Sequence, residues 1–134
     1  MGTLLGFDYG TRKIGVAVGQ TLTGTANPLE TLLLVSNKPD WERIGKLIEQ
    51  WQPEALVVGL PLDVDDTETD ATAPARRFSR QLEGRFRLKV HLAAERFTSV
   101  EARDRRGHKA KRWEDYDAMA AKLILETWLD EHSN

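Results

Sequence analysis

Three acidic residues stand at the ends of expected secondary-structure elements, where side chains can perform chemistry. Asp8 closes the apolar strand at residues 4–9, Glu95 follows an expected strand at residues 88–93, and Asp117 faces the core near the start of the last helix. A buried, ionised carboxylate is costly unless a cation or hydrogen bonds compensate it. Oxygen ligands of this kind suit Mg²⁺ or Mn²⁺. The three acids are therefore candidate catalytic residues and metal ligands.

A carboxylate cluster that holds one or two such ions beside a basic surface is suited to phosphodiester hydrolysis. Two structural alternatives stay open. Asp8 could accept hydrogen bonds from backbone N–H groups of the turn at Gly10 and Thr11. Asp117 could interact favourably with the dipole of its helix. The three histidines are isolated and lack the spacing of metal ligands.

A basic segment between residues 76 and 112 supplies the expected nucleic-acid surface. It holds 13 Lys and Arg residues against four acids, 13 minus 4, a net charge of +9. Such a segment attracts phosphate backbones, although a solvated surface without a partner is the alternative. Its densest part comprises Arg103, Arg105, Arg106, Lys109, Lys111 and Arg112. Trp113, which follows directly, is a candidate for stacking on a base.

The order of elements predicts a mixed sheet. Strands at 4–9, 14–18 and 29–35 have short connections that favour antiparallel pairing. A helix at 41–51, capped by Asp40 and ended by Pro53, leads to a buried strand at 55–60 that is expected to be parallel to its neighbour.

The second half alternates helices and strands. An exposed acidic loop at 63–70 is followed by a helix that Pro74 can start and that covers 76–85. A strand at 88–93, a helix starting at the capping box 98–101 and a final helix from residue 114 come next. Together these elements indicate an α/β fold with a mixed sheet flanked by helices.

Length and composition limit the class of protein. The 134 residues, 40% of them hydrophobic, suffice for one domain spanning 1–134. The absence of cysteine excludes disulfides and thiolate metal sites. No secretory signal and no apolar stretch near the roughly 20 residues that span a bilayer can be recognised, so we expect a cytoplasmic protein without a membrane partner.

Four motifs in order resemble those of the YqgF family, also called RuvX-like. They are Phe-Asp-Tyr-Gly-Thr-Arg-Lys-Ile-Gly-Val-Ala at 7–17, Val-Gly-Leu-Pro at 58–61, Glu-Arg-Phe-Thr-Ser-Val-Glu-Ala at 95–102 and Asp-Ala-Met-Ala-Ala at 117–121. The resemblance implies an RNase H-like fold of five strands, three antiparallel and then parallel additions. It also implies a nuclease that matures the 5′ end of pre-16S ribosomal RNA.

The resemblance assigns roles to individual residues. It puts Asp8, Glu95 and Asp117 at the presumed metal-binding carboxylates of the family. Arg96 and Thr98 are adjacent to these carboxylates, Lys13 is expected in the loop after the first strand, and all three are expected to contact nucleic acid. Where the family usually has an aspartate, this chain has Ala94. If Glu95 is the ligand, this change is tolerable, because successive residues of a strand point to opposite faces.

Other classes of protein share part of this pattern. The Asp8–Thr11 turn is also similar to the phosphate-binding turn of actin-like ATPases and sugar kinases, but those close two domains around a nucleotide and 134 residues supply one. A nucleic-acid-binding module without catalysis is a second alternative, motivated by Ala94 and the basic segment.

The sequence thus predicts a metal-dependent nuclease acting on nucleic acid. A pre-ribosomal RNA is the favoured substrate, with ribosomal particles as candidate partners. Resolution of a four-way DNA junction is the alternative, and because symmetric cleavage of two strands requires a dimer, both a monomer and a homodimer are considered.

Overall fold

The computed structural model describes residues 2–63, 65–97 and 113–132, the side chains of residues 96, 97 and 113–117 excepted. In chain order the elements are β1 (Thr3–Tyr9), β2 (Lys13–Gln20), β3 (Thr25–Leu33), α1 (Trp41–Trp51), β4 (Ala55–Asp63), α2 (Thr72–Phe86), β5 (Lys89–Phe97) and α4 (Trp113–Glu131).

The strands form one mixed sheet in the order β3-β2-β1-β4-β5. β1 pairs antiparallel with β2, and β2 pairs antiparallel with β3. β4 is parallel to β1, with Phe7 opposite Val58, and β5 is parallel to β4. The expected fold class, three antiparallel strands followed by parallel additions, is confirmed.

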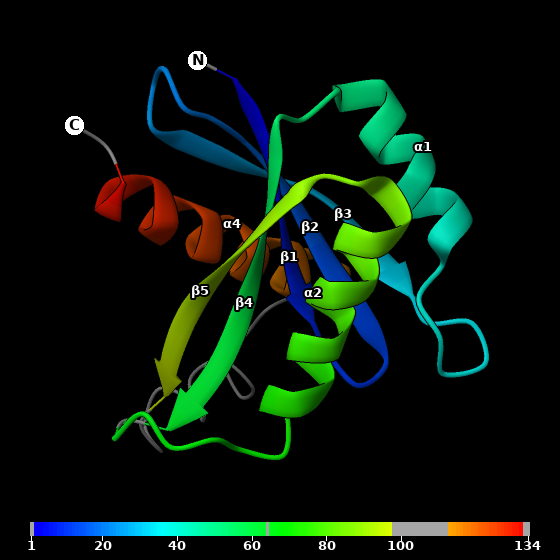
Figure 1. The fold of residues 1–134 in the computed structure, drawn as a ribbon, viewed down its shortest axis with the longest axis vertical. Helices are drawn as coiled ribbons and strands as arrows, with labels where there is room; N and C mark the ends of the chain where they lie inside the picture. Colours follow the sequence, from blue (N-terminus) through cyan, green and yellow to red (C-terminus); the bar gives the residue numbers. More distant parts are fainter. Residues whose placement is uncertain (1, 64, 98–112, 133–134) are drawn as a thin grey trace.

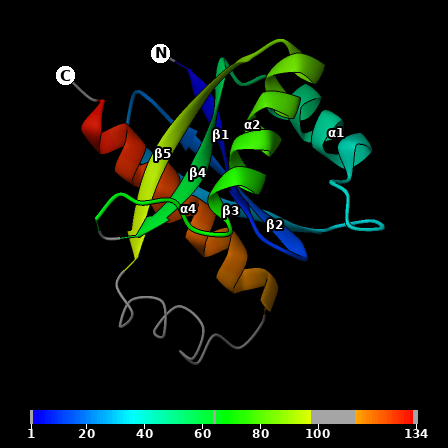
Figure 2. The same ribbon diagram turned by 60° about the horizontal axis from the view of Figure 1, so that its bottom comes forward.

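Helices cover both faces of the sheet, with α1 and α2 on one side and α4 on the other (Figures 1 and 2). The first face buries Phe7 and Val58 against Phe78 of α2, within a core that also includes α1. The second face buries Val57 against Leu125 and other apolar residues of α4. Neighbouring β1 residues contribute to opposite cores, Leu4 to the α4 side and Leu5 to the other, as the alternation of a strand requires.

Helix α1 begins and ends as predicted. The Asp40 side chain accepts a hydrogen bond from the Arg43 backbone N–H at 3.1 Å, which caps the first turn. Ile44 and Leu47 are buried on the face toward the sheet. Trp41 and Trp51 are partly buried against the same core, as their spacing predicted.

Several strand boundaries differ from the prediction. β3 begins at Thr25 rather than 29, because its register with β2 starts at the Gln20–Thr25 pair, and Pro28 is tolerated on an edge strand. β4 continues through Pro61 to Asp63, and β5 continues from Lys89 to Phe97. The two parallel strands extend each other, since each residue from Ala55 to Asp63 has a partner in β5.

Helix α2 begins at Thr72, slightly before Pro74, where the sequence predicts its start, so Pro74 lies in its first turn. The expected helix at the capping box 98–101 lies outside the described residues. Among the described residues, no helix combines the length and apolar character needed to cross a membrane.

Candidate carboxylate site

Asp8 lies near the carboxyl end of β1, on the face covered by α4. The β1 residues before it set this orientation: a β-carbon at Gly6 would lie 3.1 Å from Leu125 Cβ of α4, while Phe7 packs into the opposite core. Asp8 follows Phe7, so alternation directs its side chain to the α4 face. The residue is partly buried.

Glu95 lies within β5, which corrects the expectation that it follows the strand. It is opposite Pro61 in the parallel register of β4 and β5. Two residues before it, Ala93 packs with the α4 core, and His91 contacts the Trp128 ring at a centroid distance of 4.7 Å. Glu95 therefore shares the α4 face with Asp8.

The carboxylate of Glu95 extends across the neighbouring strand. A β-carbon at Gly59 of β4 would lie 2.6 Å from Glu95 Oε1 and 2.5 Å from Ile124 Cδ1. Gly59 directly follows Val58, the partner of Phe7 in β1. The structure thus brings the Glu95 carboxylate onto β4, beside the strand that carries Asp8 and at the same end of the sheet.

Asp117 lies in α4, one helical turn before Ala121. The Ala121 carbonyl oxygen faces Gly6 on β1, at 3.4 Å from the position of a β-carbon there. The side chain of Asp117 lies outside the described part of the chain. Among the described residues, no group of three His, Asp or Glu side chains is arranged to hold a metal ion.

Ala94 lies on the opposite face from Glu95. It is exposed, and it shares the alternation of Val90, which packs against the core under α1 and α2. The alternation argument is therefore confirmed, because a side chain at position 94 points away from the α4 face. A carboxylate at that position would not lie beside Gly59.

Lys13 is the first residue of β2 rather than a residue of the preceding loop. Its carbonyl oxygen accepts a hydrogen bond from the Gly10 N–H at 2.9 Å, so that amide has a partner within the turn. Of the other expected nucleic-acid contacts, Arg96 is described only by its place in β5. Thr98, Arg103, Arg105, Arg106, Lys109, Lys111 and Arg112, and the side chain of Trp113, lie outside the described residues.

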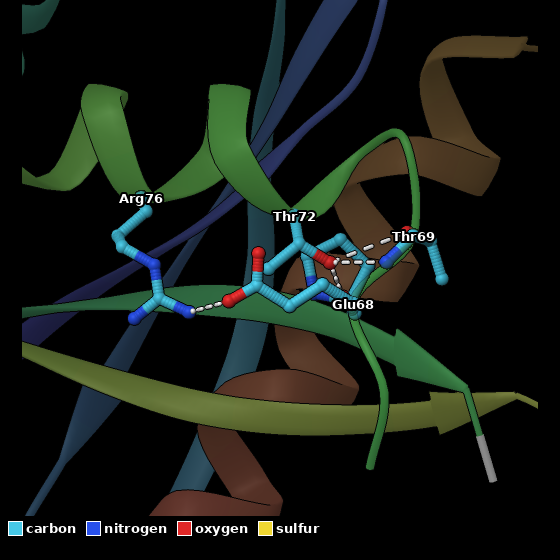
Figure 3. Close-up of polar contacts among 5 residues, drawn as sticks. Glu68, Thr69, Thr72 and Arg76 are labelled. Carbon is cyan, nitrogen blue, oxygen red and sulfur yellow. Dashed lines mark hydrogen bonds and ion pairs between the residues drawn. The ribbon is translucent and has the colours of Figure 1, made fainter. Parts of the chain in front are cut away.

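A buried threonine anchors the loop that follows β4. Thr72 is fully buried, and its hydroxyl donates to the Pro61 carbonyl at 2.5 Å and accepts from the Thr69 N–H at 2.8 Å (Figure 3). In the same view Arg76 pairs with Glu68 at 2.9 Å. These contacts fix the carboxyl end of β4, where Pro61 lies opposite Glu95.

The loop itself is exposed and acidic, as predicted. Thr67 donates its hydroxyl at 2.7 Å and its N–H at 3.2 Å to Asp65, and these bonds lower the pKa of that carboxyl. The negative charge of this loop disfavours the binding of phosphate groups there and favours their approach from another side. Sequence reasoning missed the roles of Thr72 and Gly59, because Gly59 and Pro61 enter it only through the Val-Gly-Leu-Pro motif at 58–61 and the strand was predicted to end at residue 60.

The sheet order, the two helical layers and the acids on the α4 face define the RNase H-like class of fold. Two resolvase structures resemble it in fold. Thermus thermophilus RuvC in complex with a Holliday junction substrate gives a TM-score of 0.51 at 18% identity, covering 96% of this chain and 94% of that chain. The fowlpox virus Holliday junction resolvase gives 0.53 at 13% identity, covering 96% and 97%.

Sequence comparison identifies the family. The chain belongs to the RuvX family, whose model, described as a Holliday junction resolvase, matches residues 2–131. A relative from Aeromonas salmonicida (strain A449), named "Putative pre-16S rRNA nuclease", is 47% identical over 133 residues, covering 96% of this chain and 95% of the relative. One of the same name from Yersinia pestis (strain Pestoides F) is 47% identical over 135 residues, covering 98% and 96%. The chain is thus a nuclease, an enzyme that hydrolyses phosphodiester bonds.

Proposed function

We propose that this protein is a metal-dependent endonuclease that processes the 5′ end of pre-16S ribosomal RNA. The observation that carries the chemistry is the Glu95 carboxylate over Gly59, on the face and at the end of the sheet that hold Asp8. The choice of substrate is supported by the names of relatives that share 47% of their residues over nearly the whole chain.

The donor set fits a hard divalent cation. Asp8, Glu95 and Asp117 offer only carboxylate oxygens, which Mg²⁺ and Mn²⁺ prefer. Because Gly59 has no β-carbon, the Glu95 carboxylate can lie over β4, in the space that such a carbon would occupy. These three residues would hold one or two ions. When bound, such ions activate a water molecule and stabilise charge on the phosphate.

The other residues bind and orient the nucleic acid. In this proposal Lys13, Arg96 and Thr98 contact the backbone next to the scissile phosphate, and the basic segment 103–112 binds flanking phosphates. The acidic loop after β4 repels the phosphates of the substrate and so keeps the substrate away from the surface of that loop. Residues 1–134 act as one nuclease domain in the cytoplasm, where ribosomal particles carry the precursor, as a monomer or a homodimer.

Junction resolution is the second candidate, because the matching family model is described as a Holliday junction resolvase. Both activities use the same hydrolysis, and they differ in the substrate and in the need for a dimer. The fold likeness to resolvases does not separate them, since it reflects the fold alone.

A parallel cleavage assay tests the proposal. Wild type, Asp8→Asn and a control, Glu49→Gln, are incubated with Mn²⁺ or Mg²⁺ and a labelled RNA spanning the 5′ leader, or with a four-way DNA junction. Glu49 is exposed on α1, on the other side of the sheet, so its substitution removes a carboxylate outside the site.

We expect chelator-sensitive cutting of the RNA by wild type and Glu49→Gln, and none by Asp8→Asn. Symmetric cutting of the junction alone would favour resolution. If no protein cuts either substrate while all bind nucleic acid equally, the chain is a binding module and the catalytic proposal is wrong.

A further inference from the structure

Asp8 and Glu95 lie on strands that are not neighbours. β4 separates β1 from β5 in the sheet. Because adjacent strands are about 4.8 Å apart, the two backbones are roughly 10 Å apart. Carboxylates that share an ion must bring their oxygens to about 2.1 Å from it. One of the side chains must therefore pass over β4, and the β4 residue beneath it determines whether it can.

Gly59 is that residue. A β-carbon there would be 2.6 Å from Glu95 Oε1 and 3.2 Å from its Cδ, well inside the roughly 3.5–4.0 Å at which carbon atoms pack. The carboxylate thus occupies the place of the missing side chain. Earlier positions on this face of β4, Ala55 and Val57, carry side chains that pack into the α4 core. Gly59 is the next position on this face, and there the Glu95 carboxylate lies over the strand in place of an apolar side chain.

We propose that Gly59 is a positioning residue for the catalytic site. It has no side chain, and this lets the Glu95 carboxylate cross β4 toward the Asp8 side, with Ile124 of α4 closing the same space from above. The inference rests on the proposed function, since the crossing matters only if the two carboxylates bind a common group.

A purely structural role for Gly59 makes a different prediction. Glycines also allow close approach of a helix to a sheet, and Gly19 of β2 is such a case. A β-carbon at Gly19 would lie 2.8 Å from Leu125 Cδ2 and 3.2 Å from Leu129 Cδ1 of α4, and its nearest contacts include no carboxylate. Gly19→Ala is therefore a matched control, with a similar overlap against the same helix.

Mn²⁺ affinity separates the two roles without depending on catalysis. Binding of Mn²⁺ alone is measured by the electron paramagnetic resonance of the free ion for wild type, Gly59→Ala, Gly19→Ala and Glu95→Gln, and melting curves are recorded for each. We expect Gly59→Ala to weaken Mn²⁺ binding by about tenfold or more, as displaced supporting residues of metal sites do. Gly19→Ala should leave the affinity within about twofold of wild type.

A double substitution tests whether Gly59 acts through Glu95. With Glu95→Gln already present, Gly59→Ala should weaken binding no further, because the carboxylate that it displaces is absent. Independent losses that multiply in the double variant would overturn the inference. Equal Mn²⁺ affinity of wild type and Gly59→Ala would overturn it while leaving the proposed function intact. A wild type that binds no Mn²⁺ at millimolar concentration would overturn the metal-dependent function as well.

A second substitution, Ile124→Val, serves as a control for the effect of Gly59→Ala on folding and helix packing. The three atoms that meet the new β-carbon belong to the far ends of two flexible side chains, Glu95 and Ile124, so Gly59→Ala should fold, with a Tm within about 5 °C of wild type. Ile124→Val removes the contact with Ile124 Cδ1. When Gly59→Ala is combined with Ile124→Val, the loss of Mn²⁺ affinity should persist. Restored affinity would show that Gly59 acts through helix packing. Failure of the double variant to fold would show that the carboxylate does not yield, and would also overturn the inference.

Discussion

Replacement of Thr72 by valine should destabilise the protein, because valine keeps the shape of threonine and removes its hydroxyl. That hydroxyl is fully buried and has three hydrogen-bond contacts: it donates to the Pro61 carbonyl at 2.5 Å, accepts from the Thr69 N–H at 2.8 Å and lies 3.3 Å from the Thr69 hydroxyl. Each net bond contributes about 1 kcal/mol, and a buried group left unpaired costs about 1–3 kcal/mol. We therefore expect a loss of about 2–3 kcal/mol for Thr72→Val.

The melting temperature converts this loss into a measurable shift. At about 2.1 cal/mol/K for each of 134 residues, the unfolding entropy is about 0.28 kcal/mol/K, so Tm should fall by about 7–11 °C. Thr72→Ser keeps the hydroxyl and loses one methyl group, which costs about 1 kcal/mol, or about 4 °C. Differential scanning calorimetry compares the three proteins. A valine variant that melts at or above the serine variant would refute the reasoning.

Three further predictions concern the core, the pH dependence and the basic segment. Leu125→Ala should lower the free energy of unfolding by about 2–5 kcal/mol in urea titrations, because Leu125 is fully buried, while the control Leu123→Ala, exposed on the same helix, should change it by less than about 0.5 kcal/mol; equal losses would contradict this. Burial of His91, helped by the positive charges of Lys89 and His132, lowers its pKa, so the unfolded chain binds the proton more readily and stability should fall as pH drops through about 6.5. His91→Gln should flatten that part of the urea-midpoint profile between about pH 8 and 5, and an unchanged slope would assign the effect to other groups. Arg105→Ala with Arg106→Ala should reduce the slope of log binding constant against log salt for single-stranded RNA by about 0.7 for each phosphate that the variant no longer neutralises, and an unchanged slope would remove both residues from the interface.

The fold could be predicted because apolar patterning and connection lengths constrain it strongly. The buried residues of β1 and β4 are nearly continuous, as central strands require, and the short links between β1, β2 and β3 enforce antiparallel pairing. The ends of strands were less predictable. The sequence predicts that this strand ends at residue 60, yet β4 continues to Asp63 because its parallel partner β5 supplies the pairing. The residues around Pro61 do not indicate this partner, because β5 lies further along the chain.

In the candidate site, too, features set by local sequence could be predicted, whereas features set by tertiary packing could not. Alternation along a strand is local, so the opposite orientations of Ala94 and Glu95 could be predicted from their adjacency. The proximity of Glu95 to Gly59 depends on the relative shift of β4 and β5, which places Pro61 opposite Glu95. The anchoring of Pro61 by Thr72 likewise depends on a loop that returns to the strand. Such contacts arise from tertiary packing, and no local pattern of residues encodes them.

The cleavage rate of three carboxylate variants tests the central claim most directly. Under single-turnover conditions with Mn²⁺, RNA spanning the 5′ leader is offered to Asp8→Asn, Glu95→Gln, Asp117→Asn and the control Glu49→Gln, and RNA affinity is measured in parallel. The proposal predicts that each of the first three loses more than about a hundredfold in rate without weaker RNA binding, since loss of a ligand should exceed the effect of a supporting residue. Glu49→Gln should cleave like wild type. Undiminished, chelator-sensitive cleavage by the three variants would contradict the assignment of the site.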